Sequence, residues 1–205
     1  MCIVSVLPAL SLWRALERIT PAWLTAYDYK VFSLGIVDTG IWAIIFLFIT
    51  LSCSPVQAIT RLRWPAEIRR TLGLFAFGYV LLHFAFYLVV GQKLRFDYAL
   101  KDAVLTKSRL PGWASMLLLV PLAVSSTDGM VRWLGGKAWK RLHLLVFPAT
   151  ALAIWHIAWT QTDHGTDDFQ RTRYAVVTFA ILIALRLLSK LWKFLIRRRR
   201  AASPR

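Results

Sequence analysis

The sequence lacks the residues from which most soluble catalytic sites are built. Its 205 residues include only ten Asp and Glu and two cysteines, Cys2 and Cys53. The cysteines lie far apart, without a CxxC or Cys/His spacing, so they predict neither a disulfide framework nor a zinc site. No GxGxxG after a strand, phosphate-binding loop or nucleophile elbow occurs, and the chain has no room for a soluble dinucleotide-binding domain.

Charged residues are scarce, and those present are mostly basic. The chain is 58% hydrophobic and 18% charged, with 26 Lys and Arg and a net charge of +16. Its mean hydropathy of +0.54 does not suit a water-soluble domain of this length. Nucleic acid is excluded as a partner, because no soluble module remains outside the apolar segments to carry a basic binding face. The expected surroundings are membrane lipid.

What the sequence does contain is a series of apolar runs. A helix needs roughly 20 residues to cross the hydrocarbon layer, so the third, fifth and sixth runs predict spans, and the second and fourth do so with their flanks. The first run is shorter, so either the span extends through Arg14 or the true start of the protein lies upstream. A cleaved signal peptide is not expected, because no basic stretch precedes the run. The runs are 1–13, 36–52, 71–90, 112–127, 142–160 and 174–195.

The basic residues divide unequally between the two sides of these runs. Segments 53–70, 128–141 and 190–205 carry 15 basic and 2 acidic residues, a net +13, whereas the opposite connections carry 10 and 8, a net +2. Positive loops stay in the cytoplasm. The sequence therefore predicts an all-α membrane protein: a six-transmembrane-helix bundle with both termini cytoplasmic. It forms a single domain, 1–205, with a basic cytoplasmic tail at 196–205.

Three histidines, His83, His143 and His156, lie within apolar runs. Polar groups are costly in lipid, so these side chains are functional candidates. The third and fifth runs cross in the same direction; His83 lies 14 residues beyond Arg69, and His156 lies 13 beyond His143. This predicts an outer level with His83 and His156 and an inner level roughly 20 Å deeper. Because 13 residues turn a helix by about 220°, a bend at Pro148 is also expected.

A pair of histidines at one level suits a haem iron. Small residues beside them, such as Gly73, Ala76 and Ala153, let a porphyrin or another helix approach closely. Histidines in membranes also serve packing or transport, and these interpretations stay open. Proton-coupled transporters commonly use Asp or Glu residues within the membrane. Here only Asp38, near the start of a run, could be such a residue, which makes transport the less favoured function. His164 lies in an Asp- and Gly-containing loop and is expected to be solvated.

Three stretches carry a resemblance to a known family. Segments 69–83, 122–135 and 139–156 closely resemble the MsrQ family, within the ferric-reductase-like transmembrane superfamily, and the likeness covers about residues 36–195. The resemblance implies haem b with His83, His143 and His156 as ligands. It places Arg69 where related oxidases have an inner haem histidine, which makes Arg69 a further cofactor-binding candidate.

The resemblance also implies a function. It predicts a b-type cytochrome of the bacterial inner membrane that relays electrons from a cytoplasmic flavin reductase or the quinone pool. The acceptor would be a periplasmic molybdopterin subunit that repairs methionine sulfoxide in envelope proteins. FMN is implied by the family alone, since the sequence has no flavin motif. No catalytic residue is expected in this chain.

Two other functions remain open from the sequence. One is a stand-alone ferric or quinone reductase cytochrome, and the other is a non-redox membrane protein. If a periplasmic partner exists, the exterior connections 91–111 and 160–173 are its expected docking places, and the second of these contains Asp163, Asp167 and Asp168.

Overall fold

The computed structural model describes residues 29–92, 94–163 and 170–202, and every regular element in these ranges is a helix. The predicted all-α fold is thereby confirmed, while the run 1–13 and His164 lie outside the described residues. The elements are α2 (Tyr29–Thr60), α3 (Trp64–Phe86), the π-helix η2 (Tyr87–Gly91), α4 (Phe96–Leu105), α5 (Arg109–Val124), α6 (Asp128–Leu142), the 3-10 helix η3 (His143–Leu145), α7 (Val146–Asp163) and α8 (Gln170–Ala202).

Within the described ranges, four segments are long and apolar enough to cross a membrane, so this is a multi-pass membrane protein. A fifth helix, α5, is apolar but has only 16 residues. Each of the expected runs from the second to the sixth falls largely on one of these helices. The four segments are Gly35–Thr60, Trp64–Val89, Asp128–Thr160 and Gln170–Trp192.

Two expected connections are themselves helical. Segment 128–141 forms α6, whose first turn is capped by the Thr127 hydroxyl accepting from the Met130 amide at 3.3 Å. None of the α6 residues is buried, and Gly135 interrupts the helix with a φ of 74°. The apolar part of the third long segment is therefore η3 and α7. On the other side, 91–111 contains α4, so that connection is not an open loop either.

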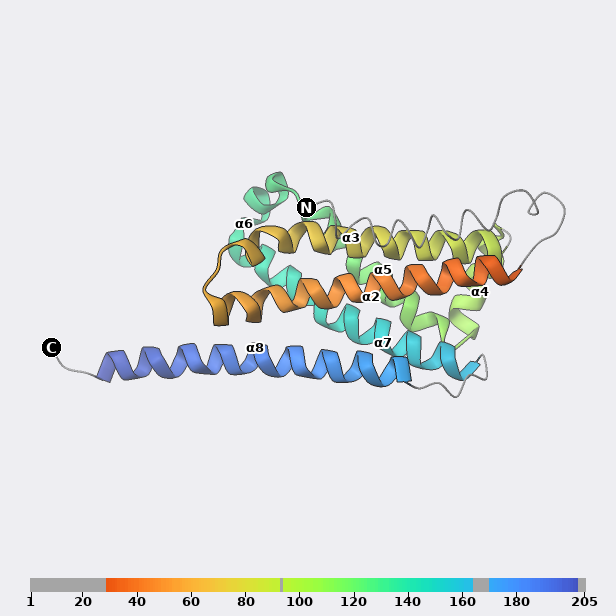
Figure 1. Ribbon diagram of the computed structural model, residues 1–205. Helices are drawn as coiled ribbons and strands as arrows, with labels where there is room; N and C mark the ends of the chain where they lie inside the picture. The colour runs from red at the N-terminus through yellow and green to blue at the C-terminus, as the bar shows by residue number, and fades with distance from the viewer. Residues whose placement is uncertain (1–28, 93, 164–169, 203–205) are drawn as a thin grey trace.

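The long helices form a bundle with one peripheral member. Figure 1 shows α2, α3, α5 and α7 side by side, with α4 at one end, α6 at the other, and α8 along the outside. In its most apolar stretch, α2 is 44% buried, against 6% for α8. Phe46 on α2, Ala76 on α3 and Ala149 on α7 are almost fully enclosed. Most of α8 therefore presents its apolar side chains to lipid, and the core is formed mainly by the other four helices.

The chain changes helix type between His143 and His156, where a bend at Pro148 was expected. Residues His143–Leu145 form a 3-10 turn, and the α-helix resumes at Val146. Pro148 has no amide hydrogen to donate to the carbonyl of Leu144, so the preceding turn cannot complete its α-helical bonds. The unwinding allows His143 and the α7 residues to be oriented independently.

Candidate functional site

The structure brings His83 of α3 and His156 of α7 together. Their ring centroids lie 6.2 Å apart, and the ring planes are inclined by 77°. Both side chains are mostly enclosed within the bundle. Two residues that are 73 positions apart in the chain thus form one site, at the level that the residue spacing indicates.

Each ring is fixed by a backbone carbonyl of another segment. Nδ1 of His83 lies 2.8 Å from the carbonyl oxygen of Ile36, and Nδ1 of His156 lies 2.6 Å from that of Ser108. A carbonyl oxygen can only accept, so each Nδ1 carries the hydrogen and donates. In the neutral imidazole with this tautomer, Nε2 carries the free lone pair, as in metal-binding histidines.

Two glycines make room for these rings. A Cβ added at Gly40 of α2 would lie 3.1 Å from both Cε1 and Nδ1 of His83. A Cβ added at Gly112 of α5 would lie 3.0 Å from Nδ1 of His156. Any larger residue would push on a ring already held by its hydrogen bond. The sequence reasoning did not identify either glycine as part of the site.

The spacing of the two rings fits axial ligation of one metal ion. Two metal–nitrogen bonds of about 2 Å, each followed by about 1 Å to the ring centre, separate the centroids by about 6 Å. A site made only of protein ligands usually needs three or four of them. Among the described residues there is no group of three His, Cys, Asp or Glu that could hold a metal. Two imidazoles at this spacing would therefore suit a metal ion whose other ligands come from a macrocycle.

Unpaired polar atoms border His156. The hydroxyl of Ser108 is buried and has no hydrogen-bond partner in the described part of the chain, and the same holds for Nε of Arg109. Arg109 Nε lies 3.4 Å from Asp102, close enough for charge attraction but not aligned as a hydrogen bond. These donors begin α5 and lie next to the carbonyl that fixes His156. Nothing in the sequence pattern marked Ser108 or Arg109.

Asp102 organises this polar cluster. Its carboxylate accepts from the hydroxyls of Tyr87 at 2.7 Å and Thr106 at 2.6 Å. Burial raises the pKa of Asp102, but these hydrogen bonds and the Arg109 cation outweigh burial and hold the pKa below its ordinary value. The carboxylate is therefore charged at neutral pH and neutralises Arg109 beside the histidine pair.

His143 and Arg69 lie in a separate neighbourhood. Nδ1 of His143 is 3.1 Å from the carbonyl of Trp139, one turn earlier, and the two rings are tilted with centroids 3.9 Å apart. Nη1 of Arg69 donates to the Ser54 hydroxyl at 3.0 Å. Arg70, next to Arg69 in the chain, donates to the carbonyl of Ser126, and the Trp139 indole donates to the carbonyl of Ser125, so this end of α3 lies near His143. The four predicted site residues thus fall into two groups, His83 with His156 and Arg69 with His143.

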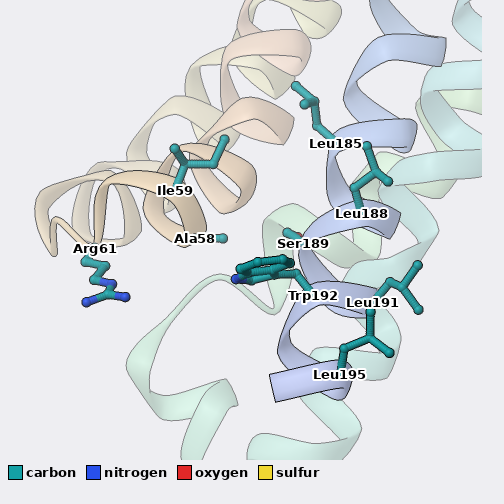
Figure 2. Close-up of a pocket in the computed structure, with 9 residues that line it drawn as sticks. All are labelled: Ala58, Ile59, Arg61, Leu185, Leu188, Ser189, Leu191, Trp192 and Leu195. Carbon is teal, nitrogen blue, oxygen red and sulfur yellow. The ribbon is translucent and has the colours of Figure 1, made fainter. Parts of the chain in front are cut away.

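An apolar groove lies outside both groups. Figure 2 shows it between the end of α2 and the last part of α8, where the Trp192 indole extends toward Ala58 and Arg61 stands at the edge. Its volume is about 460 Å³. None of the predicted site residues lines it, and walls of this kind are covered by lipid chains in a membrane.

Comparison with known proteins gives consistent matches. Residues 34–154 match the family model described as ferric reductase like transmembrane component. The chain is 38% identical over 150 residues to the protein-methionine-sulfoxide reductase heme-binding subunit MsrQ of Herminiimonas arsenicoxydans, covering 73% of this chain and 68% of the relative. It is 44% identical over 117 residues to MsrQ of Rhodospirillum rubrum, covering 57% and 56%.

A third relative has another name. The magnetosome protein MamZ of Magnetospirillum gryphiswaldense is 42% identical over 143 residues, which are 70% of this chain but 22% of that protein. The same membrane unit therefore also occurs as part of a longer polypeptide. Both the family model and the full-length relatives agree with the resemblance seen in the sequence, and the chain belongs to the ferric reductase-like transmembrane family, in its MsrQ group.

Proposed function

We propose that this chain is a b-type cytochrome subunit whose haem iron is held between His83 and His156. The observation that carries the proposal is the 6.2 Å separation of two imidazoles whose Nδ1 atoms are already engaged. The chain aligns with more than two thirds of the length of two relatives that are named as haem-binding subunits. Haem, when bound, supplies one-electron transfer.

The surrounding residues position the ligands and neutralise charge. The carbonyls of Ile36 and Ser108 hold each imidazole in the tautomer that leaves Nε2 free. The Ser108 hydroxyl and the Arg109 guanidinium offer the donors that the carboxylates of a haem need. With His83 and His156 both holding the iron, a bound haem would have no position left for oxygen or substrate. The subunit relays electrons and does not transform a substrate.

We propose a direction of flow from the cytoplasm outward, across the bacterial inner membrane. The net +13 of segments 53–70, 128–141 and 190–205 supports a cytoplasmic location for them and for both termini. The donor is a cytoplasmic flavin reductase or the quinone pool, and the acceptor is a periplasmic molybdopterin methionine-sulfoxide reductase. FMN is a further proposed cofactor on the family resemblance alone, and no residue of the chain is assigned to bind it.

The orientation has a direct test. Reporter fusions within 128–141 and after Arg200 should report the cytoplasm, and a fusion within 160–173 should report the exterior. An exterior signal after Arg200 would reverse the inner and outer levels and with them the direction of flow.

Stopped-flow spectroscopy tests the relay itself. Reduction of the haem by NAD(P)H should require an added flavin reductase or reduced flavin. Reoxidation should accelerate only with the molybdopterin subunit and methionine sulfoxide. Reversing Asp163, Asp167 and Asp168, the proposed docking charges, should slow reoxidation without changing the haem spectrum.

The outcomes distinguish the alternative functions. If the molybdopterin subunit produces no acceleration over buffer, sulfoxide repair is wrong for this chain even if haem is bound. Rapid reoxidation by ferric chelates or quinone alone would identify a stand-alone reductase. Absence of any haem absorbance in the purified protein would leave only a non-redox role.

A further inference from the structure

Arg186 lies on α8, the helix that otherwise faces lipid, and its side chain is partly buried. Ala175, Phe179, Leu182 and Arg186 are spaced by four, three and four residues on α8, so they share one face. The first three of these residues pack with the hydrophobic core. Arg186 therefore continues the stripe that faces the bundle, and its guanidinium does not face lipid.

The surroundings of Arg186 leave it without a counter-charge. Its Cζ lies 4.6 Å from the centre of the Phe147 ring of α7. Nη1 is buried and has no hydrogen-bond partner within the described ranges. A cation stacked on an aromatic ring gains a modest attraction, but its hydrogen-bond donors stay unused. Buried charges in membrane proteins are kept when a partner or a ligand compensates for them.

Arg69 of α3 adds a second cation to the same place. Its guanidinium donates to Ser54 of α2, one turn before Ala58, and Ala58 lines the groove of Figure 2 together with Leu185 and Ser189 of α8, the residues around Arg186. Among the described residues its hydrogen-bond partner is Ser54, and neither arginine forms an ion pair with an Asp or Glu. Two guanidinium groups that repel each other in a poorly solvated setting are costly unless an anion lies between or beside them.

Both arginines lie near the same end of the bundle. Arg69 is five residues after the start of α3, and Arg186 is six residues before the end of the apolar segment Gln170–Trp192. At 1.5 Å per residue each is about 8 Å from that end. An anionic group attached to a membrane-resident molecule reaches this depth from the interface.

We propose that Arg69, Arg186 and the Phe147 ring form a binding site for an anionic group, a carboxylate or a phosphate, of a membrane-resident ligand. The site is separate from the histidine pair and does not depend on the haem proposed there. Planar guanidinium groups bind both kinds of anion with paired hydrogen bonds. Two sources have this chemistry: the phosphate of an anionic lipid and the propionate of a second, inner haem.

The test compares Arg186→Gln with Lys190→Gln, an exposed residue of α8 one turn further on. Each purified protein is melted in nanodiscs of phosphatidylcholine with and without phosphatidylglycerol, and its haem content is measured. If lipid phosphate is bound, phosphatidylglycerol should raise the Tm of wild type and of Lys190→Gln by about 3 °C or more, and this rise should be lost in Arg186→Gln. If a propionate is bound, Arg186→Gln should lose haem while Lys190→Gln retains it.

The proposal is overturned if Arg186→Gln matches Lys190→Gln in both measurements. It is also overturned if Arg186→Gln melts well below wild type in phosphatidylcholine with its haem content and its phosphatidylglycerol response intact, because the arginine is then only structural. Without a ligand, loss of an unpaired buried cation should leave the Tm equal or higher. Should Arg186→Gln fail to fold, Arg186→Lys is measured: it keeps the charge and should retain most of the response, whereas no response there would also contradict the site.

Discussion

The two histidine levels, predicted from the sequence as outer and inner, use histidine in different ways. His83 and His156 are each held through Nδ1 by a carbonyl of another segment, beside glycines that admit the rings. His143 is held by the carbonyl of Trp139, one turn earlier, and lies near the end of α3 that carries Arg69 and Arg70. A ring fixed by a distant segment has a defined position relative to a second ring. A ring fixed within its own helix does not.

This difference predicts which histidine matters most to a haem in the outer site. His83→Ala or His156→Ala should remove nearly all low-spin haem from that site, because an axial imidazole is lost. His143→Ala should leave the outer haem in place, since that side chain is not part of the pair. Reduced-minus-oxidised spectra and haem-to-protein ratios of the purified variants measure this. Full retention of haem in both of the first two variants would exclude the outer pair as ligands.

Substitution of a glycine beside the histidine pair should have a smaller effect on haem content than loss of a histidine. Gly112→Ala puts a methyl group against a ring with no space for it and should lower haem occupancy by roughly half or more. In a helix this substitution otherwise stabilises by about 1 kcal/mol, so the fold should be retained while haem is lost. Gly78→Ala is the matched control, because a Cβ there meets nothing within 4 Å. Equal haem contents in the two variants would show that the close approach is unimportant.

The sequence predicted the helical spans and the levels of the histidines well, because both depend on spacing along a single helix. Runs of apolar residues determine where spans occur, and a rise of 1.5 Å per residue determines relative depth. It also predicted a break near Pro148, since a missing amide donor acts locally. His83 and His156 could therefore be paired without tertiary information.

Other parts of the site depend on contacts between distant segments, which periodicity does not encode. Ser108 fixes His156 from 48 residues away, and Gly112 admits the ring from the next helix. The sequence pattern did not mark Arg186, because the face of α8 on which it lies is defined by the core packed against that helix. Segment 128–141 was expected to be a connection because it is polar. It instead forms the helix α6, which is stabilised by its cap and its own backbone hydrogen bonds although none of its residues is buried.

The smallest effect concerns Asp102, which supports the outer site indirectly. Because its pKa is lowered in the folded protein, its contribution to stability is present above the ordinary Asp pKa of about 3.9 and is lost as pH falls through the lower folded value. Asp102→Asn should cost about 1 kcal/mol near neutral pH and flatten the acid-side decline in Tm. Asp97→Asn, which removes a looser pair with Arg95 on the exposed side of α4, is the control. Parallel Tm profiles for wild type and Asp102→Asn would contradict this role.

The central claim is that both axial positions of the outer haem are filled by His83 and His156, and binding of carbon monoxide to the reduced protein tests it most directly. Wild type should show no change in its spectrum on addition of carbon monoxide, because neither imidazole leaves the iron open. His156→Ala protein that retains any haem should bind it at once. A carbon monoxide complex formed rapidly and fully by wild type would mean that an axial position is open, and the paired-histidine account would be wrong.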